Sequence, residues 1–145
     1  MEQLTSDSMI SIALGIAIFA AFKFMPRILA WGIPFHGPEA VKARIDKGDN
    51  VLVIDVRSAA EFTGELGHVP GSINLDSASL AARINELGDK LSPHKNEPVV
   101  VTCRTHNRSP RAAKVLKAAG FDDVSVMKGG LSAWNRAGYQ TERRA

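Results

Sequence analysis

Short strand-like segments alternate with helix-like segments along most of this 145-residue chain. The strand-like segments cover residues 51–54, 72–75, 99–102 and 124–127, and residues 31–37 form either a connector or a short first strand. The runs at 51–54 and 99–102 are rich in Val, Leu and Ile, which is typical of strands buried on both faces of a parallel sheet. Alternating strands and helices therefore predict an α/β fold, a mostly parallel five-stranded sheet with helices on both faces.

Proline, glycine and capping residues mark where the helices begin and end. We expect helices over residues 38–47, 80–87, 109–120 and 131–136. Ser58 and Glu61 have the spacing of a capping box and predict a short helical turn over residues 58–62. Ser109 directly precedes Pro110, so we expect its side chain to cap the helix that follows.

The composition fits one globular domain with an appendage. Hydrophobic residues make up 45% and charged residues 23% of the chain, which is ordinary for a folded domain. We divide the chain into a hydrophobic N-terminal helix over residues 1–30 and an α/β domain over residues 31–145. The formal net charge is +3, and the basic residues are scattered with few aromatic residues between them. This pattern predicts that the protein does not bind nucleic acid.

An uncharged apolar segment lies near the N-terminus. Residues 9–22 carry no charge, and the apolar stretch extends through Met25 if Lys23 directs its ammonium group out of the apolar layer. That length is near the lower limit of about 17 residues for a transmembrane helix. Glu2 and Asp7 precede the segment and no small-residue cleavage site follows it, which disfavours a secretory signal peptide. We expect a single-pass membrane anchor, with a buried core helix as the alternative.

Charges that flank the apolar segment predict its orientation. Lys23 and Arg27 follow the segment, whereas acidic residues precede it. The positive-inside rule therefore places the α/β domain on the cytoplasmic side of the membrane. Small residues at helical spacing within the segment would also allow two copies of the chain to pair as a homodimer.

The lone cysteine of the chain, Cys103, directly follows the strand-like run 99–102 and precedes a polar loop and a helix. This order puts the sulfur at a helix N-terminus, where unpaired N–H groups and the positive end of the helix dipole favour an anion. A single cysteine excludes an intramolecular disulfide and a multi-cysteine metal site. We interpret Cys103 as a nucleophilic or sulfur-carrying thiolate, and the alternative is a small buried core residue.

Two arginines in the loop distinguish between classes of cysteine enzyme. Arg104 and Arg108 can each bind an oxyanion through two parallel hydrogen bonds, which suits thiosulfate, sulfite or phosphate. Cysteine phosphatases place their arginine six positions after the cysteine, whereas Arg108 lies five positions after Cys103 and Ser109 lies sixth. The shorter loop favours a single sulfur atom bound to Cys103 and disfavours a phosphatase or an arsenate reductase.

Several motifs together resemble the single-domain rhodanese family of sulfurtransferases over nearly all of residues 31–145. The matching motifs are D-V-R with E-F at 55–62, G-H-V-P-G-S-I-N at 67–74, C-R-T-H-N-R-S at 103–109, and K-G-G at 128–130 followed by Trp134 and Gly138-Tyr139. The resemblance implies that Cys103 attacks the outer sulfur of thiosulfate or a similar donor and carries it as a persulfide. The acceptor would be cyanide, a thiol or a protein, and no metal or organic cofactor would be needed.

The resemblance also implies roles for the residues around Cys103. The substrate-binding residues would be Arg104, Thr105, His106, Asn107, Arg108 and Ser109. Their backbone N–H groups would surround the persulfide, and the arginines would attract the small anionic donor. Asp55 and Arg57 would support the site, with Asp55 orienting a loop arginine. A structural ion pair between Arg57 and Glu61, with Asp55 bonded to the backbone, is an equally open interpretation.

His106 is a departure from the family pattern, because the family usually has glycine at this position. If the backbone adopts a positive φ there, histidine is less favourable than glycine. A catalytically weak module that serves as a membrane-associated binding domain is therefore an alternative function, with His106 as the cause of the weakness.

Overall fold

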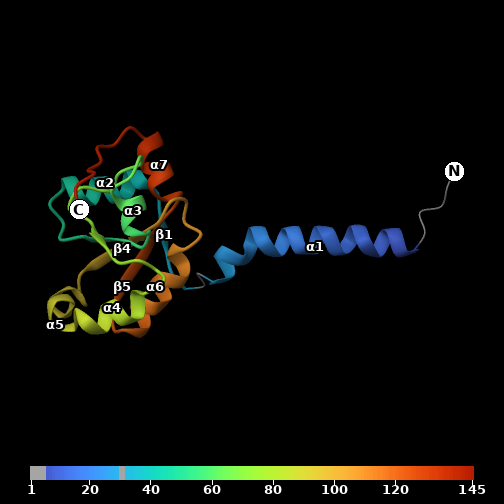
Figure 1. The fold of residues 1–145 in the computed structure, drawn as a ribbon, viewed down its shortest axis with the longest axis horizontal. Helices are drawn as coiled ribbons and strands as arrows, with labels where there is room; N and C mark the ends of the chain where they lie inside the picture. Colours follow the sequence, from blue (N-terminus) through green and yellow to red (C-terminus); the bar gives the residue numbers. More distant parts are fainter. Residues whose placement is uncertain (1–5, 30–31) are drawn as a thin grey trace.

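The computed structural model describes residues 6–29 and 32–145, so the predicted boundary at residues 30 and 31 lies outside the described residues. A five-stranded sheet lies at the centre of the α/β part, and helices cover both of its faces (Figure 1). The strands are β1 (Phe35–His36), β2 (Leu52–Asp55), β3 (Ile73–Asn74), β4 (Pro98–Thr102) and β5 (Asp123–Met127). The helices are α1 (Ser6–Leu29), α2 (Pro38–Asp46), α3 (Ala59–Phe62), α4 (Leu80–Glu86), α5 (Gly88–Leu91), α6 (Ser109–Ala118) and α7 (Gly130–Arg136), with a 3-10 turn at Ser92–His94.

The sheet has the strand order β1-β5-β4-β2-β3, and each neighbouring pair is parallel. The predicted five-stranded, mostly parallel α/β fold is therefore confirmed. Strand β2 leads through α3 to β3 on one side, whereas β4 leads through α6 to β5 on the other side. The connections diverge after β2 and β4, and sheets of this type bind ligands beyond the carboxyl ends of the strands at such a point.

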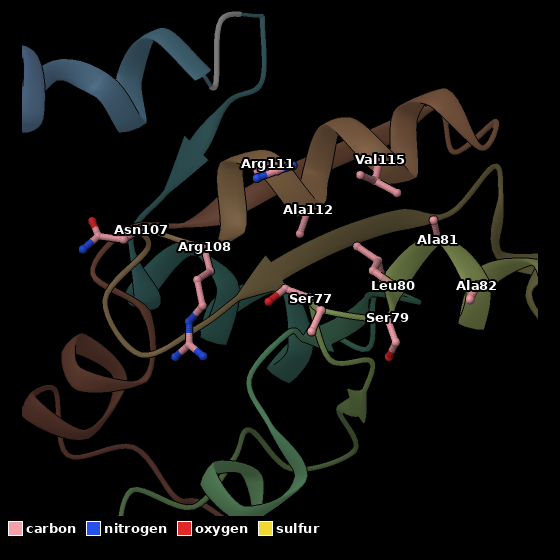
Figure 2. Close-up of a pocket in the computed structure, with 11 residues that line it drawn as sticks. Ser77, Ser79, Leu80, Ala81, Ala82, Asn107, Arg108, Arg111, Ala112 and Val115 are labelled. Carbon is pink, nitrogen blue, oxygen red and sulfur yellow. The ribbon is translucent and has the colours of Figure 1, made fainter.

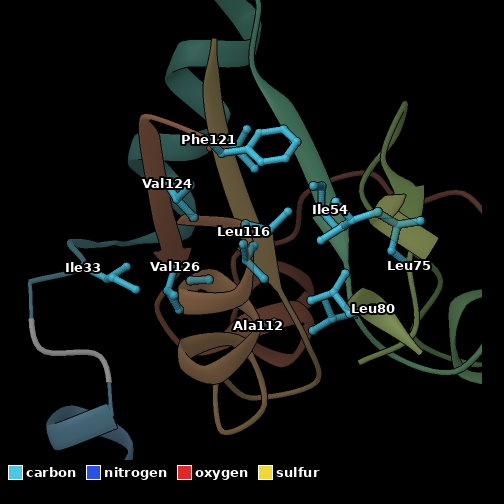
Figure 3. Close-up of a cluster of buried hydrophobic side chains, with 14 of the residues drawn as sticks. Ile33, Ile54, Leu75, Leu80, Ala112, Leu116, Phe121, Val124 and Val126 are labelled. Atoms are coloured by element: carbon cyan, nitrogen blue, oxygen red, sulfur yellow. The ribbon is translucent and has the colours of Figure 1, made fainter. Parts of the chain in front are cut away.

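Two apolar clusters hold the helices against the sheet. On one face, helices α4, α5 and α6 pack against Ile54 of β2, Val99 of β4 and Val124 of β5 (Figure 3). On the other face, α2 and α7 pack against Val53 and Val100. Successive residues of a strand point to opposite faces, so a strand that is covered on both sides needs apolar residues without alternation.

Helix α1 extends away from these layers as a long apolar rod, although it also contacts α6 (Figure 1). Its segment Ser8–Met25 has a mean hydropathy of 2.0, and none of that segment is buried inside the protein. Large apolar side chains such as Ile16, Phe19 and Phe22 are therefore exposed. The helix is long enough and apolar enough to cross a membrane, and an N-terminal signal sequence would have the same properties.

One capping prediction is wrong. Helix α6 already includes Ser109, and Arg108 is its N-cap residue with helical φ and ψ of −84° and −30°. The Ser109 hydroxyl is buried and finds no hydrogen-bond partner among the described residues, so it does not cap the helix. The loop itself enters the helical conformation one residue early, which moves Ser109 from the capping position into the first turn.

Candidate active site

The connections that follow β2 and β4 start side by side and carry the predicted site residues. Asp55 and Thr102 are paired across neighbouring strands at the ends of β2 and β4. Arg57 and the short helix α3 follow β2, and Cys103 with its loop follows β4. In sheets of this kind, ligands bind beyond the carboxyl ends of the strands where the chain direction diverges.

Cys103 lies at the bottom of its loop with 1% of its surface exposed. Its Sγ accepts a hydrogen bond from the backbone N–H of His106 at 3.2 Å, within the loop that leads into α6. Apolar residues of the core surround the other side of the cysteine. The thiol is thus buried, as the core-residue interpretation expects, but a loop N–H also points at its sulfur, as an anion site requires.

The first backbone N–H groups of helix α7 hold the start of the Cys103 loop in place. Leu131 donates its backbone N–H to the carbonyl of Cys103, and Ser132 donates to the carbonyl of Arg104, both at 2.9 Å. Gly130 permits this close approach, since an added Cβ would overlap the Cys103 carbonyl oxygen, and its φ is +57°. Sequence reasoning used this glycine only as part of a motif and missed that it sets the position of the loop.

His106 adopts a φ of 124°, a region that favours glycine. Two contacts hold it there. Its Nδ1 accepts a hydrogen bond from the Gly129 N–H at 2.9 Å, and its ring lies edge-on to Phe35 with the ring centres 5.9 Å apart.

Arg108 forms a forked ion pair with Glu61 from α3. Its two terminal nitrogens donate to the two carboxylate oxygens of Glu61 at 2.8 and 2.9 Å. The hydrogen bonds from Arg108 lower the pKa of Glu61 to about 2, and the same pair raises the pKa of Arg108. Glu61 also closes the capping box with Ser58. The predicted capping box is confirmed, whereas the alternative pair between Glu61 and Arg57 is wrong.

Asp55 and Arg57 pair with each other in the interior. Arg57 Nε lies 2.9 Å from Asp55 Oδ1, and a terminal nitrogen of Arg57 lies 2.6 Å from Oδ2. The same nitrogen donates to the carbonyl of Gly67 at 2.6 Å. Both side chains are almost fully buried. Asp55 therefore orients Arg57 rather than a loop arginine, and the pair ties the end of β2 to the glycine-rich segment around Gly67.

The remaining loop residues face outward. Arg104, Thr105 and Asn107 are exposed. Within residues 6–29 and 32–145, no hydrogen bond or ion pair holds the guanidinium of Arg104. No group of three or more His, Cys, Asp or Glu side chains gathers in these described ranges in a way that could hold a metal ion. The loop thus combines one fixed arginine with one that is free to move.

The fold and the loop define a known class of protein. A family model of the rhodanese-like domain matches residues 37–137, so the chain belongs to the rhodanese-like sulfurtransferase family. Thiosulfate sulfurtransferase GlpE of Pseudomonas syringae pv. syringae is 35% identical over 105 residues, which cover 72% of this chain and 89% of GlpE.

Other relatives match this chain over different shares of their own length. YrkF of Bacillus subtilis is 30% identical over 105 residues, but the match spans only 52% of its length. A solved structure from Rhodopseudomonas palustris, RPA3614, is described as a possible tyrosine phosphatase. The structural match has a TM-score of 0.70 at 26% sequence identity. It covers 83% of this chain and 92% of RPA3614.

Proposed function

We propose that this protein is a sulfurtransferase that moves a sulfane sulfur atom from thiosulfate or a similar anionic donor to a thiophilic acceptor. The Cys103 thiolate attacks the outer sulfur of the donor, a new S–S bond forms on Cys103, and sulfite leaves with the electron pair of the broken S–S bond. A nucleophilic acceptor such as cyanide, a thiol or a protein thiolate then attacks the outer sulfur, and Cys103 leaves as a thiolate. No metal or organic cofactor takes part.

The hydrogen bond from the His106 N–H to Cys103 Sγ is the observation that carries this proposal. A backbone donor that already points at the sulfur stabilises negative charge there without reorganisation during the reaction. The buried Ser109 hydroxyl, which has no partner among the described residues, is a second group that can donate to a sulfur atom added on Cys103. Membership in the sulfurtransferase family and the name of the relative GlpE support the same chemistry.

The two loop arginines take different parts in the proposed reaction. Arg108 is fixed by Glu61, so it supplies a positive charge of constant position beside the loop. Arg104 is exposed and can turn toward an arriving donor. Thr105 and Asn107 are further substrate-binding residues of the loop, and the pair of Asp55 and Arg57 supports the site by holding the end of β2 beside Thr102. The positive charges of Arg104 and Arg108 attract a small anion and stabilise the departing sulfite.

Formation of thiocyanate from thiosulfate and cyanide tests the proposal. The full-length chain in detergent is expected to form thiocyanate with ping-pong kinetics, because the sulfur passes through Cys103. Cys103→Ser is expected to lose the activity. Thiocyanate formation equal to that of Cys103→Ser would reject the proposal, and hydrolysis of an aryl phosphate by the unaltered protein would instead support a phosphatase.

We also propose that α1 anchors the protein in a membrane as a single span, with the rhodanese-like domain, residues 31–145, on the cytoplasmic side. The apolar side chains of Ser8–Met25 are exposed on the protein. The hydrocarbon core of a membrane would remove this apolar surface from water. Lys23 lies toward the end of the helix that precedes the domain, where the positive-inside rule favours the cytoplasmic face.

A further inference from the structure

A pocket of about 720 Å³ lies between helix α1 and the Cys103 loop. Its lining consists of Phe19, Phe22 and Lys23 from α1, together with Phe35, His106, Asn107 and Lys128 from the α/β domain. Figure 2 shows that the side chain of Asn107 points away from Arg108, so these neighbouring loop residues face different surroundings. The pocket therefore connects the proposed membrane span with the loop that carries Cys103.

The wall that the domain contributes to this pocket is held in place by contacts between several elements. The rings of Phe35 and His106 lie edge-on with their centres 5.9 Å apart, and the Gly129 N–H donates to His106 Nδ1 at 2.9 Å. Lys128 donates its backbone N–H to the carbonyl of His36 at 2.8 Å, directly after the paired ends of β1 and β5. A ligand thus meets a wall that is already formed.

The charged side chains of the pocket are positive. Lys23 and Lys128 line it, and none of the lining residues among 6–29 and 32–145 is acidic. Both lysines are exposed, and within these same ranges no ion pair or hydrogen bond occupies either ammonium group. Two unused ammonium groups that border one pocket attract an anion such as a phosphate.

The side of the pocket that α1 contributes is apolar. Phe19 and Phe22 are exposed there, and Phe19 precedes Lys23 by four positions, about 6 Å along a helix. In the proposed membrane orientation, Lys23 lies at the level of the headgroups and the phenylalanines lie toward the hydrocarbon. Cavities of about 300 to 1,000 Å³ are typical of sites for organic ligands. The pocket therefore suits a ligand with an anionic group beside an apolar chain.

We infer that this pocket binds an anionic membrane phospholipid, with the headgroup phosphate between Lys23 and Lys128 and an acyl chain against the phenylalanines of α1. The membrane as the source of the lipid rests on the proposed single-span anchor, whereas lipid binding in the pocket does not. Lys128 belongs to the domain and not to α1, so the bound lipid ties the domain to the membrane surface. This contact holds the Cys103 loop beside the headgroups.

Native mass spectrometry of the full-length chain in an uncharged detergent measures lipid binding directly. The probes are phosphatidylglycerol and phosphatidylcholine with identical acyl chains, because only the former carries a net negative charge. We expect phosphatidylglycerol to bind at least about fivefold more tightly. Lys128→Gln is expected to weaken its binding about fivefold, the effect of one lysine at an anionic lipid surface, and Lys128→Arg is expected to retain it.

A matched control removes a lysine outside the pocket but close to α1. Lys114 is exposed on α6, the helix that α1 contacts, and it does not line the pocket. Lys114→Gln is expected to bind phosphatidylglycerol as the unaltered chain does. Equal weakening by Lys114→Gln and Lys128→Gln would show only general attraction of anions and would overturn the inference. Equal binding of the two lipids, or a second copy of the chain bound in place of lipid, would also overturn it.

Two further measurements separate the source of the phosphate and the fate of the anchor. Excess inorganic phosphate is expected not to displace phosphatidylglycerol, because it has no apolar part; displacement would overturn the inference. If a carbonate wash leaves the chain in the membrane fraction but Lys128→Gln binds lipid as the unaltered chain does, the pocket fails and the anchor stands. If the wash releases a chain whose variants bind lipid in the expected order, the anchor fails and the lipid pocket stands.

Discussion

Glu61 has two structural roles in the short helix α3. It closes the capping box that starts the helix at Ser58, and it holds the guanidinium of Arg108 from the loop after β4. Glu61 and Arg108 are 47 positions apart in the chain and reach each other from the connections after β2 and β4. The pair is therefore a tie between these two connections and fixes the arginine nearest to α6. Glu61 is a positioning residue for the proposed reaction.

Replacing this carboxylate tests the positioning role. Glu61→Gln keeps the shape of the side chain but removes the charge that orients Arg108. We expect thiocyanate turnover to fall about tenfold because the guanidinium loses its fixed place, while stability falls by only about 1 kcal/mol because the pair is partly exposed. The control is Glu65→Gln at an exposed carboxylate of the same segment. Equal turnover in both variants would contradict the role.

The pair also predicts a pH dependence of stability. The pKa of Glu61 is lowered from 4.5 to about 2 in the folded protein, chiefly by the hydrogen bonds from Arg108. Its charge therefore contributes stability that is fully present above pH 4.5 and is lost as the pH falls toward 2. In urea titrations, the stability difference between the unaltered chain and Glu61→Gln should be constant between about pH 7 and pH 5 and smaller near pH 3. A difference that grows on acidification would contradict this assignment.

The buried pair of Asp55 and Arg57 should matter far more for stability than a surface pair does. Asp55→Asn leaves the Arg57 guanidinium buried without its carboxylate, and such a change costs roughly 3 kcal/mol or more. Asp46→Asn, which breaks the exposed pair with Lys42, should cost less than about 1 kcal/mol. Urea unfolding measures both costs, and similar values would show that the interior pair does not hold the end of β2.

For single residues, the sequence predicted which of them belong to the site better than it predicted which of them pair with each other. Cys103 and its loop were recognisable because a strand, a cysteine and a helix follow one another directly. The capping box was predictable because both residues lie within one turn. The partner of Arg108 was not predictable, since it depends on where two distant connections meet. For His106, the sequence indicated only that a positive φ would be unfavourable if it occurred. The contacts with Gly129 and Phe35 that hold this φ come from other elements and were not predictable.

Among the elements, α7 holds the Cys103 loop from outside the loop's own connection. Its first N–H groups bind the carbonyls of Cys103 and Arg104, and Gly130 lies where no side chain fits. Helix α7 is therefore a support that fixes the position of the loop backbone relative to the sheet. The position of this support depends on the packing of Leu131 and Trp134 against the face of the sheet that α2 also covers.

Adding a methyl group at Gly130 tests this support. Gly130→Ala places a Cβ against the Cys103 carbonyl and in a strained backbone conformation, so we expect a loss of about 2 kcal/mol or more. Gly88→Ala adds the same group in open space inside a helical turn and should be neutral or stabilising by up to about 1 kcal/mol. Thermal unfolding compares them. If Gly130→Ala is as stable as Gly88→Ala, the loop does not depend on close packing.

The order and type of the elements follow from local patterns that the sequence displays openly. Buried parallel strands require apolar runs. In β4, Val99 and Val101 join one apolar cluster and Val100 joins the other. The start of α6 was harder to predict because the conformation of the loop, rather than the serine and proline, sets the first helical residue. The divergence of the connections after β2 and β4 could not be predicted from local patterns either, because strand order is a property of the whole sheet.

At the scale of the whole molecule, an apolar rod is joined to a folded α/β domain (Figure 1). The two apolar clusters of the domain are formed without α1 residues. Deleting residues 1–25 should therefore leave a soluble domain with unchanged thiocyanate turnover, while the full-length chain stays in the membrane fraction after a carbonate wash. An insoluble or inactive deletion product would mean that α1 belongs to the folded core.

The proposed function depends on Cys103 acting as a carrier of one sulfur atom. The most direct measurement is the intact mass of the protein after incubation with thiosulfate and removal of the excess. We expect a gain of the mass of one sulfur atom, which cyanide removes and which Cys103→Ser never acquires. A protein whose mass does not change under these conditions, although its fold is intact by circular dichroism, would contradict the central claim.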